Sequence, residues 1–200
     1  MAPLMSTMKN LLTQVIPETG WAAFTPAERE LLLHNLDGFG TYGPPAAAYL
    51  REHATAFGYL PQAASGGGWT LRNNLTLPPD TDLNDKRVMA LIIHEVLHLQ
   101  QSVTMRLSIQ GELQAWQLEY QAYHAGTGTW YGDPGTPFAG TRTHWEAMLK
   151  LSFESREHLV EAQRLMIAIS PVYRANMLPL YPLGREAMHR VANSFSRTNI

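Results

Sequence analysis

Apolar residues recur at intervals of three and four along most of the chain, which is the spacing of amphipathic helices. The pattern therefore predicts a mainly α-helical protein with a small β-sheet, an α+β fold. One helix has an especially clear start, because Thr25 can cap it, Pro26 suits the first helical position and Glu28 completes a capping box. The helices expected outside the central part of the chain span residues 4–16, 26–36, 45–57, 142–151, 154–169 and 183–195.

One stretch follows the two-residue alternation of a β-strand instead. In residues 69–77, the apolar Trp69, Leu71, Leu75 and Leu77 alternate with polar residues. Glycines precede this stretch and two prolines follow it. We therefore expect a single strand with a turn on either side.

An apolar helical stretch, residues 91–99, contains the pattern His-Glu-x-x-His. Because residues four apart are separated by about 40° around a helix, His94 and His98 stack on one face, where each can give a nitrogen to one metal ion. Glu95 borders the same opening and suits a carboxylate that takes a proton from a metal-bound water. A metal also offsets the cost of burying these three polar groups among Leu, Ile and Val.

We expect this helix to begin after a cap at Asp80 or Asp82 and to continue to about Met105. The next helix is expected to begin near Ser108. It ends before residues 125–141, which are rich in Gly, Thr and Pro and are expected to form one long loop.

Two histidines do not complete a catalytic zinc site, which usually has three protein ligands and a water. The chain has no cysteine, so the third ligand must be a histidine or a carboxylate. Glu112 and Glu119 lie seven residues apart on the next helix and so nearly on one face. Each is followed three residues later by alanine, which lets two helices approach closely. A symmetric hairpin about residues 106–108 would favour Glu119, and both remain candidates on this reasoning.

Length, composition and charge fit one globular domain spanning residues 1–200. The chain is 45% hydrophobic, and its net charge of −2 gives no electrostatic case for binding nucleic acid or an anionic membrane. No apolar run reaches the roughly 18 residues of a membrane span. The start of the chain does not have the pattern of a signal peptide, so we expect a cytoplasmic protein, with export by a non-standard route left open.

The His-Glu-x-x-His helix followed by a glutamate-bearing helix resembles the zincin metallopeptidases, specifically the gluzincin branch. The resemblance covers residues 69–125, with helical extensions on both sides. It implies that His94, His98 and Glu112 bind Zn²⁺ and that Glu95 is the general base. It also implies a peptide or protein substrate held along the strand at 69–77. By this resemblance Glu112 is preferred as the third ligand, and Glu119 would orient a ligand histidine.

The sequence departs from that family in several positions. Gln100 stands where the extended zincin pattern has an apolar residue, and only 13 residues separate His98 from Glu112, which favours Glu119. The third histidine of metzincins is absent, and a deformylase-like site would need a cysteine. The donor that would stabilise the oxyanion is left open, with His124, Tyr120, Tyr123, Tyr131 and His144 as candidates.

The leading functional hypothesis is thus a zinc metallopeptidase, a hydrolase. An alternative is a di-iron or di-manganese helical oxidoreductase, because Glu95 with His98 and Glu186 with His189 both have the Glu-x-x-His spacing of such sites. Its further ligands would come from Glu112 or Glu119 and from Glu154, Glu157 or Glu161. Another alternative is a binding or effector module that keeps a zincin scaffold without turnover. The sequence does not indicate the oligomeric state.

Overall fold

The computed structural model of the protein describes residues 20–53, 55–60, 68–69, 74–171, 173 and 178–185. Helices predominate in the described part, with one small sheet, so the expected α+β class is confirmed. None of the described helices is long and apolar enough to cross a membrane. The helices are α2 (Pro26–Asp37), α3 (Gly43–Glu52), α4 (Lys86–Gln100), α5 (Val103–Arg106), α6 (Ile109–Thr127), α7 (Arg142–Leu149) and α8 (Arg156–Ile169).

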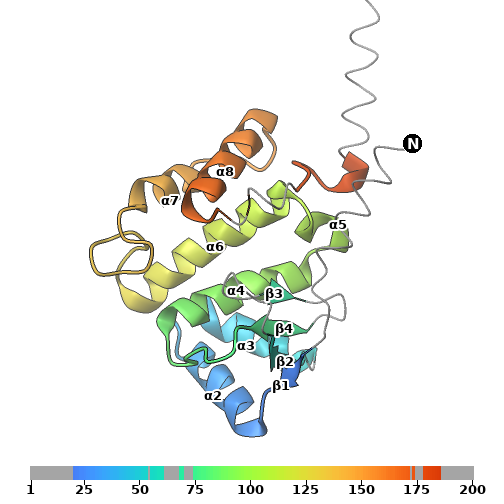
Figure 1. Ribbon diagram of the computed structural model, residues 1–200, viewed down its shortest axis with the longest axis vertical. Helices are drawn as coiled ribbons and strands as arrows, with labels where there is room; N and C mark the ends of the chain where they lie inside the picture. The colour runs from blue at the N-terminus through green and yellow to red at the C-terminus, as the bar shows by residue number, and fades with distance from the viewer. Residues whose placement is uncertain are drawn as a thin grey trace, which may run out of the picture.

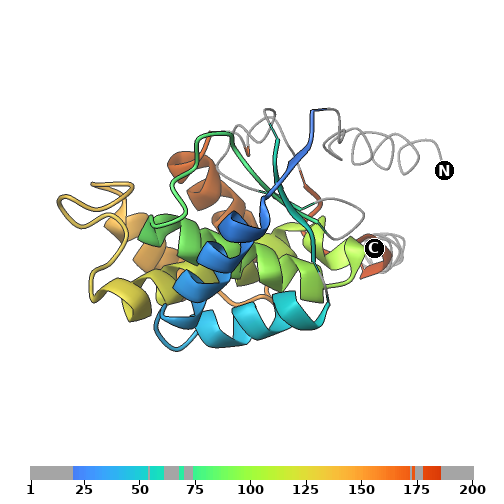
Figure 2. The ribbon, with the colours of Figure 1, turned by 90° about the horizontal axis from the view of Figure 1, so that it is seen from below.

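Helices α4 and α6 lie side by side at the centre of the molecule (Figure 1). Helices α7 and α8 cover α6 on the side away from α4, while α2, α3 and the sheet lie on the side of α4 (Figures 1 and 2). Buried apolar side chains continue through these layers, including Met89 and Ile93 on α4 and Leu113 on α6. The two central helices are thus packed on both sides, which holds their facing residues in fixed positions.

In the part of the chain that the structure describes, the sheet has four strands in the order β1-β2-β4-β3, and the expected single strand at 69–77 is wrong. Within that stretch Trp69 pairs antiparallel with Leu75, so its two ends belong to different strands. Because these paired residues are also an even number of positions apart in the sequence, their alternation matches that of one long strand. Only β2 and β4 are parallel, so β4 is internal and β3 is an edge strand. The strands are β1 (Ala22–Ala23), β2 (Phe57–Tyr59), β3 (Gly68–Trp69) and β4 (Leu75–Leu77).

Several helix ends differ from the sequence predictions. The capping box of α2 is present as expected, but α3 ends at Glu52, and Phe57, expected at the end of that helix, begins β2. Asp85, rather than Asp80 or Asp82, caps α4 by accepting a hydrogen bond from the Arg87 amide.

The break between α4 and α6 comes earlier than expected. Helix α4 ends at Gln100, because Gln101 is extended and Ser102 then caps the short α5. The expected continuation of α4 to Met105 is therefore wrong, although Met105 is itself helical within α5. Ser108 caps α6 as expected, and its side chain accepts a hydrogen bond from the Gly111 amide.

Helix α6 runs about one turn into the stretch expected to be a loop. It ends at Thr127, where Gly128 takes the left-handed conformation with a φ of 75°. The following segment, residues 128–141, protrudes beyond the helices at one end of the molecule (Figure 2). Its Tyr131 is nevertheless fully buried and stacks on Tyr123 of α6.

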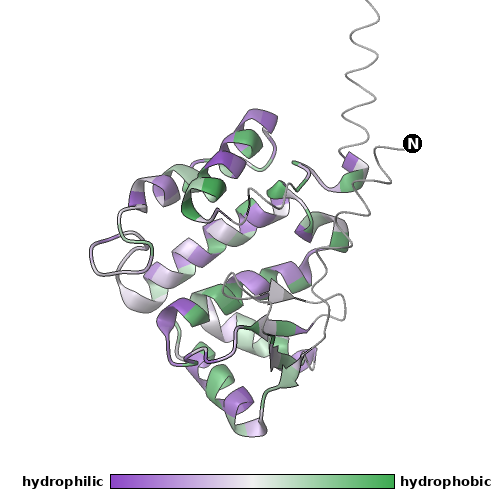
Figure 3. Cartoon of the chain, in the orientation of Figure 1, coloured by the Kyte–Doolittle hydropathy of each residue, from purple (hydrophilic) through white to green (hydrophobic). Residues whose placement is uncertain are grey.

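Helices α7 and α8 were both expected, and their bounds lie close to the predicted ones. Hydrophobic and hydrophilic residues alternate along α8 (Figure 3). Its buried residues are Leu159, Ala162, Leu165, Met166 and Ile169, which follow the helical spacing. The expected helix at 4–16 and most of the one at 183–195 lie outside the described residues.

Candidate metal centre

His94 and His98 lie one turn apart on α4, on the face that packs against α6. Both are buried, and their Nε2 atoms are 3.0 Å apart. Glu112, in the first turn of α6, brings its Oε1 to 3.4 Å from His98 Nε2 and its Oε2 to 3.9 Å from His94 Nε2. Bonds of about 2.0–2.1 Å in a tetrahedron put ligand atoms about 3.3 Å apart, close to these separations. The group could therefore hold a metal ion.

On the side of each ring away from Nε2, the Nδ1 atoms of the two histidines have separate partners. His98 Nδ1 lies 3.0 Å from Gln101 Oε1, while the Gln101 amide nitrogen donates to Gln114 Oε1 at 3.0 Å. His94 Nδ1 lies 2.9 Å from Glu119 Oε2, although its hydrogen does not point straight at that oxygen. Because both partner oxygens are acceptors, these contacts favour the hydrogen on Nδ1 of each imidazole.

With that orientation the two Nε2 atoms face each other at 3.0 Å, and a shared hydrogen or a cation can occupy the space between them. Burial lowers the pKa of His94, but the contact with Glu119 and the charges of Glu95, Glu119 and Glu112 outweigh it and raise the pKa to about 9. Burial and the charge of His94 hold the pKa of His98 well below its usual value. A metal ion fits the position between the two Nε2 atoms.

Glu95 lies beside this group and is only 5% exposed. Its Oε2 has no hydrogen-bond partner among the described residues. Burial raises the pKa of Glu95 to about 7; the charge of His94 opposes the rise, while those of Glu112 and Glu119 add to it. A buried carboxyl group with a free oxygen and a pKa near neutrality can both accept and return a proton.

The two glutamates of α6 occupy different places around His94. Glu112 faces the Nε2 atoms of both histidines, whereas Glu119 contacts Nδ1 on the far side of the His94 ring. Within the described residues, the group suited to a metal contains Glu112 and not Glu119. Glu119 therefore has the geometry of a residue that fixes the orientation of His94.

Two residues of this environment were missed by sequence reasoning. Tyr173 donates a hydrogen bond to Glu112 Oε2 at 2.9 Å, and Trp116 donates one to the Tyr173 hydroxyl at 2.9 Å. Trp116 follows Glu112 by one helical turn, so the spacing could have indicated it. Tyr173 comes 61 residues after Glu112 and carries no local signal.

The residues proposed to stabilise an oxyanion lie mainly in an aromatic cluster. Tyr120, Tyr123 and Tyr131 pack together with Trp145, and His124 stacks on Trp130. Tyr131 is near Glu119, behind His94, where burial together with the Glu119 charge keeps its pKa well above the usual range. His144 lies in α7.

The additional carboxylates that the two-metal alternative requires bind other residues and not the group of His94, His98 and Glu112. Glu154 pairs with Arg185, Glu161 pairs with Arg164, and Glu157 accepts a hydrogen bond from Ser155. Glu186 and His189 lie outside the described residues.

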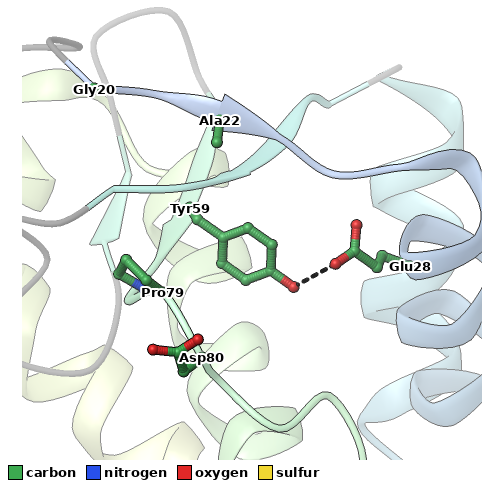
Figure 4. A pocket seen from close by; sticks show the side chains of 6 residues that line it. All are labelled: Gly20, Ala22, Glu28, Tyr59, Pro79 and Asp80. Carbon is green, nitrogen blue, oxygen red and sulfur yellow. Dashed lines mark hydrogen bonds between the residues drawn. The ribbon is translucent and has the colours of Figure 1, made fainter.

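A hollow of about 420 Å³, away from the candidate metal centre, is lined by residues from β1, β2, α2 and the segment after β4. In it the Tyr59 hydroxyl donates to Glu28 at 2.9 Å (Figure 4), and burial raises the pKa of Tyr59 to about 12. Glu28 also serves the capping box of α2, so its oxygens are used within the protein. None of the candidate metal ligands lines this hollow.

Protein-family models, curated proteins and solved structures were compared with the chain, and no match was found among them.

Proposed function

We propose that the protein is a zinc-dependent metallopeptidase with His94, His98 and Glu112 as ligands and Glu95 as general base. The observation that carries this proposal is the convergence of two imidazole Nε2 atoms and a carboxylate beside a buried carboxyl group, one oxygen of which has no hydrogen-bond partner among the described residues. Three nitrogen and oxygen ligands with one open position are typical of catalytic zinc. When bound, a zinc ion would acidify a water molecule and polarise a peptide carbonyl.

The roles of the protein groups follow from their surroundings. Glu95 would accept a proton from the attacking water and deliver it to the leaving amine, because its carboxyl group is buried beside the proposed ligands with one oxygen that has no hydrogen-bond partner among the described residues. Glu119 and Gln101 would keep both imidazoles turned with Nε2 toward the metal. The buried surroundings exclude competing water and strengthen each of these interactions.

The proposed substrate is an extended peptide, bound along β3 as an additional strand. β3 is the edge of the described sheet and contacts α4, the helix with both histidines. An edge strand offers unpaired main-chain groups that a peptide can bind without regard to its side chains.

Metal analysis is the direct test of the proposed centre. We expect about one zinc per purified chain, measured by elemental analysis after growth with zinc, iron and manganese all supplied. Two irons or two manganese ions per chain would instead support the oxidoreductase hypothesis. A chain that takes up no metal even when incubated with excess zinc would contradict both.

A competition titration with a zinc chelator distinguishes the roles of the two glutamates of α6. Glu112→Gln should weaken zinc binding far more than Glu119→Gln, because the first removes a ligand and the second only a support of His94. Loss of such a support typically costs about 10–100-fold in metal affinity. The reverse order of the two variants would transfer the ligand role to Glu119.

A further inference from the structure

A chain of three side chains leads from the interior of the protein to the proposed metal ligand. Trp116 Nε1 lies 2.9 Å from the Tyr173 hydroxyl oxygen, which lies 2.9 Å from Glu112 Oε2. The indole can only donate, so the phenol oxygen accepts from it. The single phenol hydrogen is then left for Glu112, which fixes the direction of both hydrogen bonds.

The donors of this chain are held rigidly. The ring of Tyr173 meets that of Trp116 edge to face, with centroids 5.3 Å apart. Trp116 in turn stacks on Trp145 of α7, with centroids 4.9 Å apart. Close packing on these faces leaves the phenol little freedom to turn away from Glu112.

The two oxygens of Glu112 therefore differ. Oε2 receives the phenol hydrogen, whereas Oε1 is the nearer of the two to a histidine nitrogen, at 3.4 Å from His98 Nε2. A hydrogen bond to one carboxylate oxygen draws charge from it and fixes the plane of the group. Oε1 is then the oxygen offered to the metal.

We propose that Tyr173, supported by Trp116, holds Glu112 as a ligand through one oxygen only, and so keeps one coordination position open. Tyr173 is here a positioning residue, and the inference rests on the metal centre proposed above. Without the phenol hydrogen, Glu112 can turn both oxygens to the metal and fill the position that a substrate or water needs.

Pro179 and Leu180 are bound to the end of α6 that carries Glu112. The amides of Ile109 and Gln110, at the start of that helix, donate to the carbonyls of Pro179 and Leu180 at 2.8 and 3.0 Å. Amides in the first turn have no partner within their own helix, so these bonds satisfy them. The start of α6 is thus held by a part of the chain that follows Tyr173 in sequence.

Cobalt provides a test that does not depend on activity, because the visible absorption of Co²⁺ is strong in four-coordinate sites and weaker in five-coordinate ones. Wild-type protein loaded with Co²⁺ should show the strong absorption. Tyr173→Phe should show the weaker one and should bind zinc about 10–100-fold less tightly. Trp116→Phe should keep the four-coordinate spectrum, since the phenol still donates to Glu112, with a smaller loss of affinity.

Tyr181→Phe is the matched control, since Tyr181 is a buried tyrosine of the same region whose hydroxyl donates to the Glu154 carbonyl. It should leave the cobalt spectrum unchanged. A Tyr173→Phe spectrum identical to that of the wild type would overturn this inference while leaving the metal centre intact. Wild-type protein that binds no Co²⁺ or Zn²⁺ would overturn the centre itself. X-ray absorption on the zinc-loaded wild type is independent of any variant, and a carboxylate bound through both oxygens would refute the proposal.

Discussion

Glu95→Gln is expected to bind zinc as tightly as the wild type while hydrolysing peptides about 10²–10⁴-fold more slowly, the range that general-base assistance contributes. The substitution keeps the size of the side chain and leaves His94, His98 and Glu112 in place. It removes only the basic carboxylate, whose free oxygen is buried beside the proposed ligands. The measurement is kcat/KM on a broad library of extended peptides, together with the zinc content of each preparation.

Glu30→Gln makes the same chemical change on an exposed face of α2 and should keep wild-type activity. A Glu95→Gln enzyme that hydrolyses peptides at the wild-type rate would end the mechanism proposed here. Wild-type protein that carries zinc but cleaves nothing in the library would favour the hypothesis of a binding module on a zincin scaffold.

His98→Ala should abolish the stabilisation that zinc gives to the folded protein. A ligand at a thousand times its Kd stabilises the folded state by about 4 kcal/mol. For a domain of this length such a gain raises the Tm by roughly 8–16 °C. Thermal unfolding of wild type and variant, each with zinc and with chelator, measures the difference directly. We expect the zinc-dependent rise in the wild type and almost none in His98→Ala.

His34→Ala is the control for this comparison, because His34 is exposed on α2. Its zinc-dependent rise in Tm should equal that of the wild type. Equal rises in His98→Ala and wild type would show that zinc binds elsewhere, and the centre on α4 and α6 would have to be abandoned.

The sequence pattern predicted which helices carry the candidate ligands, but not how these helices lie against each other. Spacing alone was enough to find the helix with His94 and His98 and the next helix with two glutamates. It could not separate Glu112 from Glu119, because both lie on one face of α6 and differ only in which nitrogen of His94 they approach. That difference depends on the relative positions of α6 and α4 along their axes, which no local sequence pattern specifies.

The wrong strand prediction and the overlooked Tyr173 also involve contacts between residues that are not close in the sequence. The antiparallel strands β3 and β4 resembled a single strand in the sequence, because the paired residues Trp69 and Leu75 are an even number of positions apart. Tyr173 was overlooked because its partner in the chain precedes it by 61 residues. By contrast, the capping box at Thr25 was correctly predicted, since it involves residues three apart.

Tyr173 follows Glu112 by 61 residues, so the two are synthesised at different times. The proposed ligands span only residues 94–112, and contacts of such short range form early, whereas long-range contacts close slowly. A chain growing from the ribosome therefore presents both histidines and Glu112 well before Tyr173 has been synthesised. On the proposed function, metal binding would begin on the nascent chain, and the contact that is proposed to keep a coordination position open would form only after Tyr173 has been added.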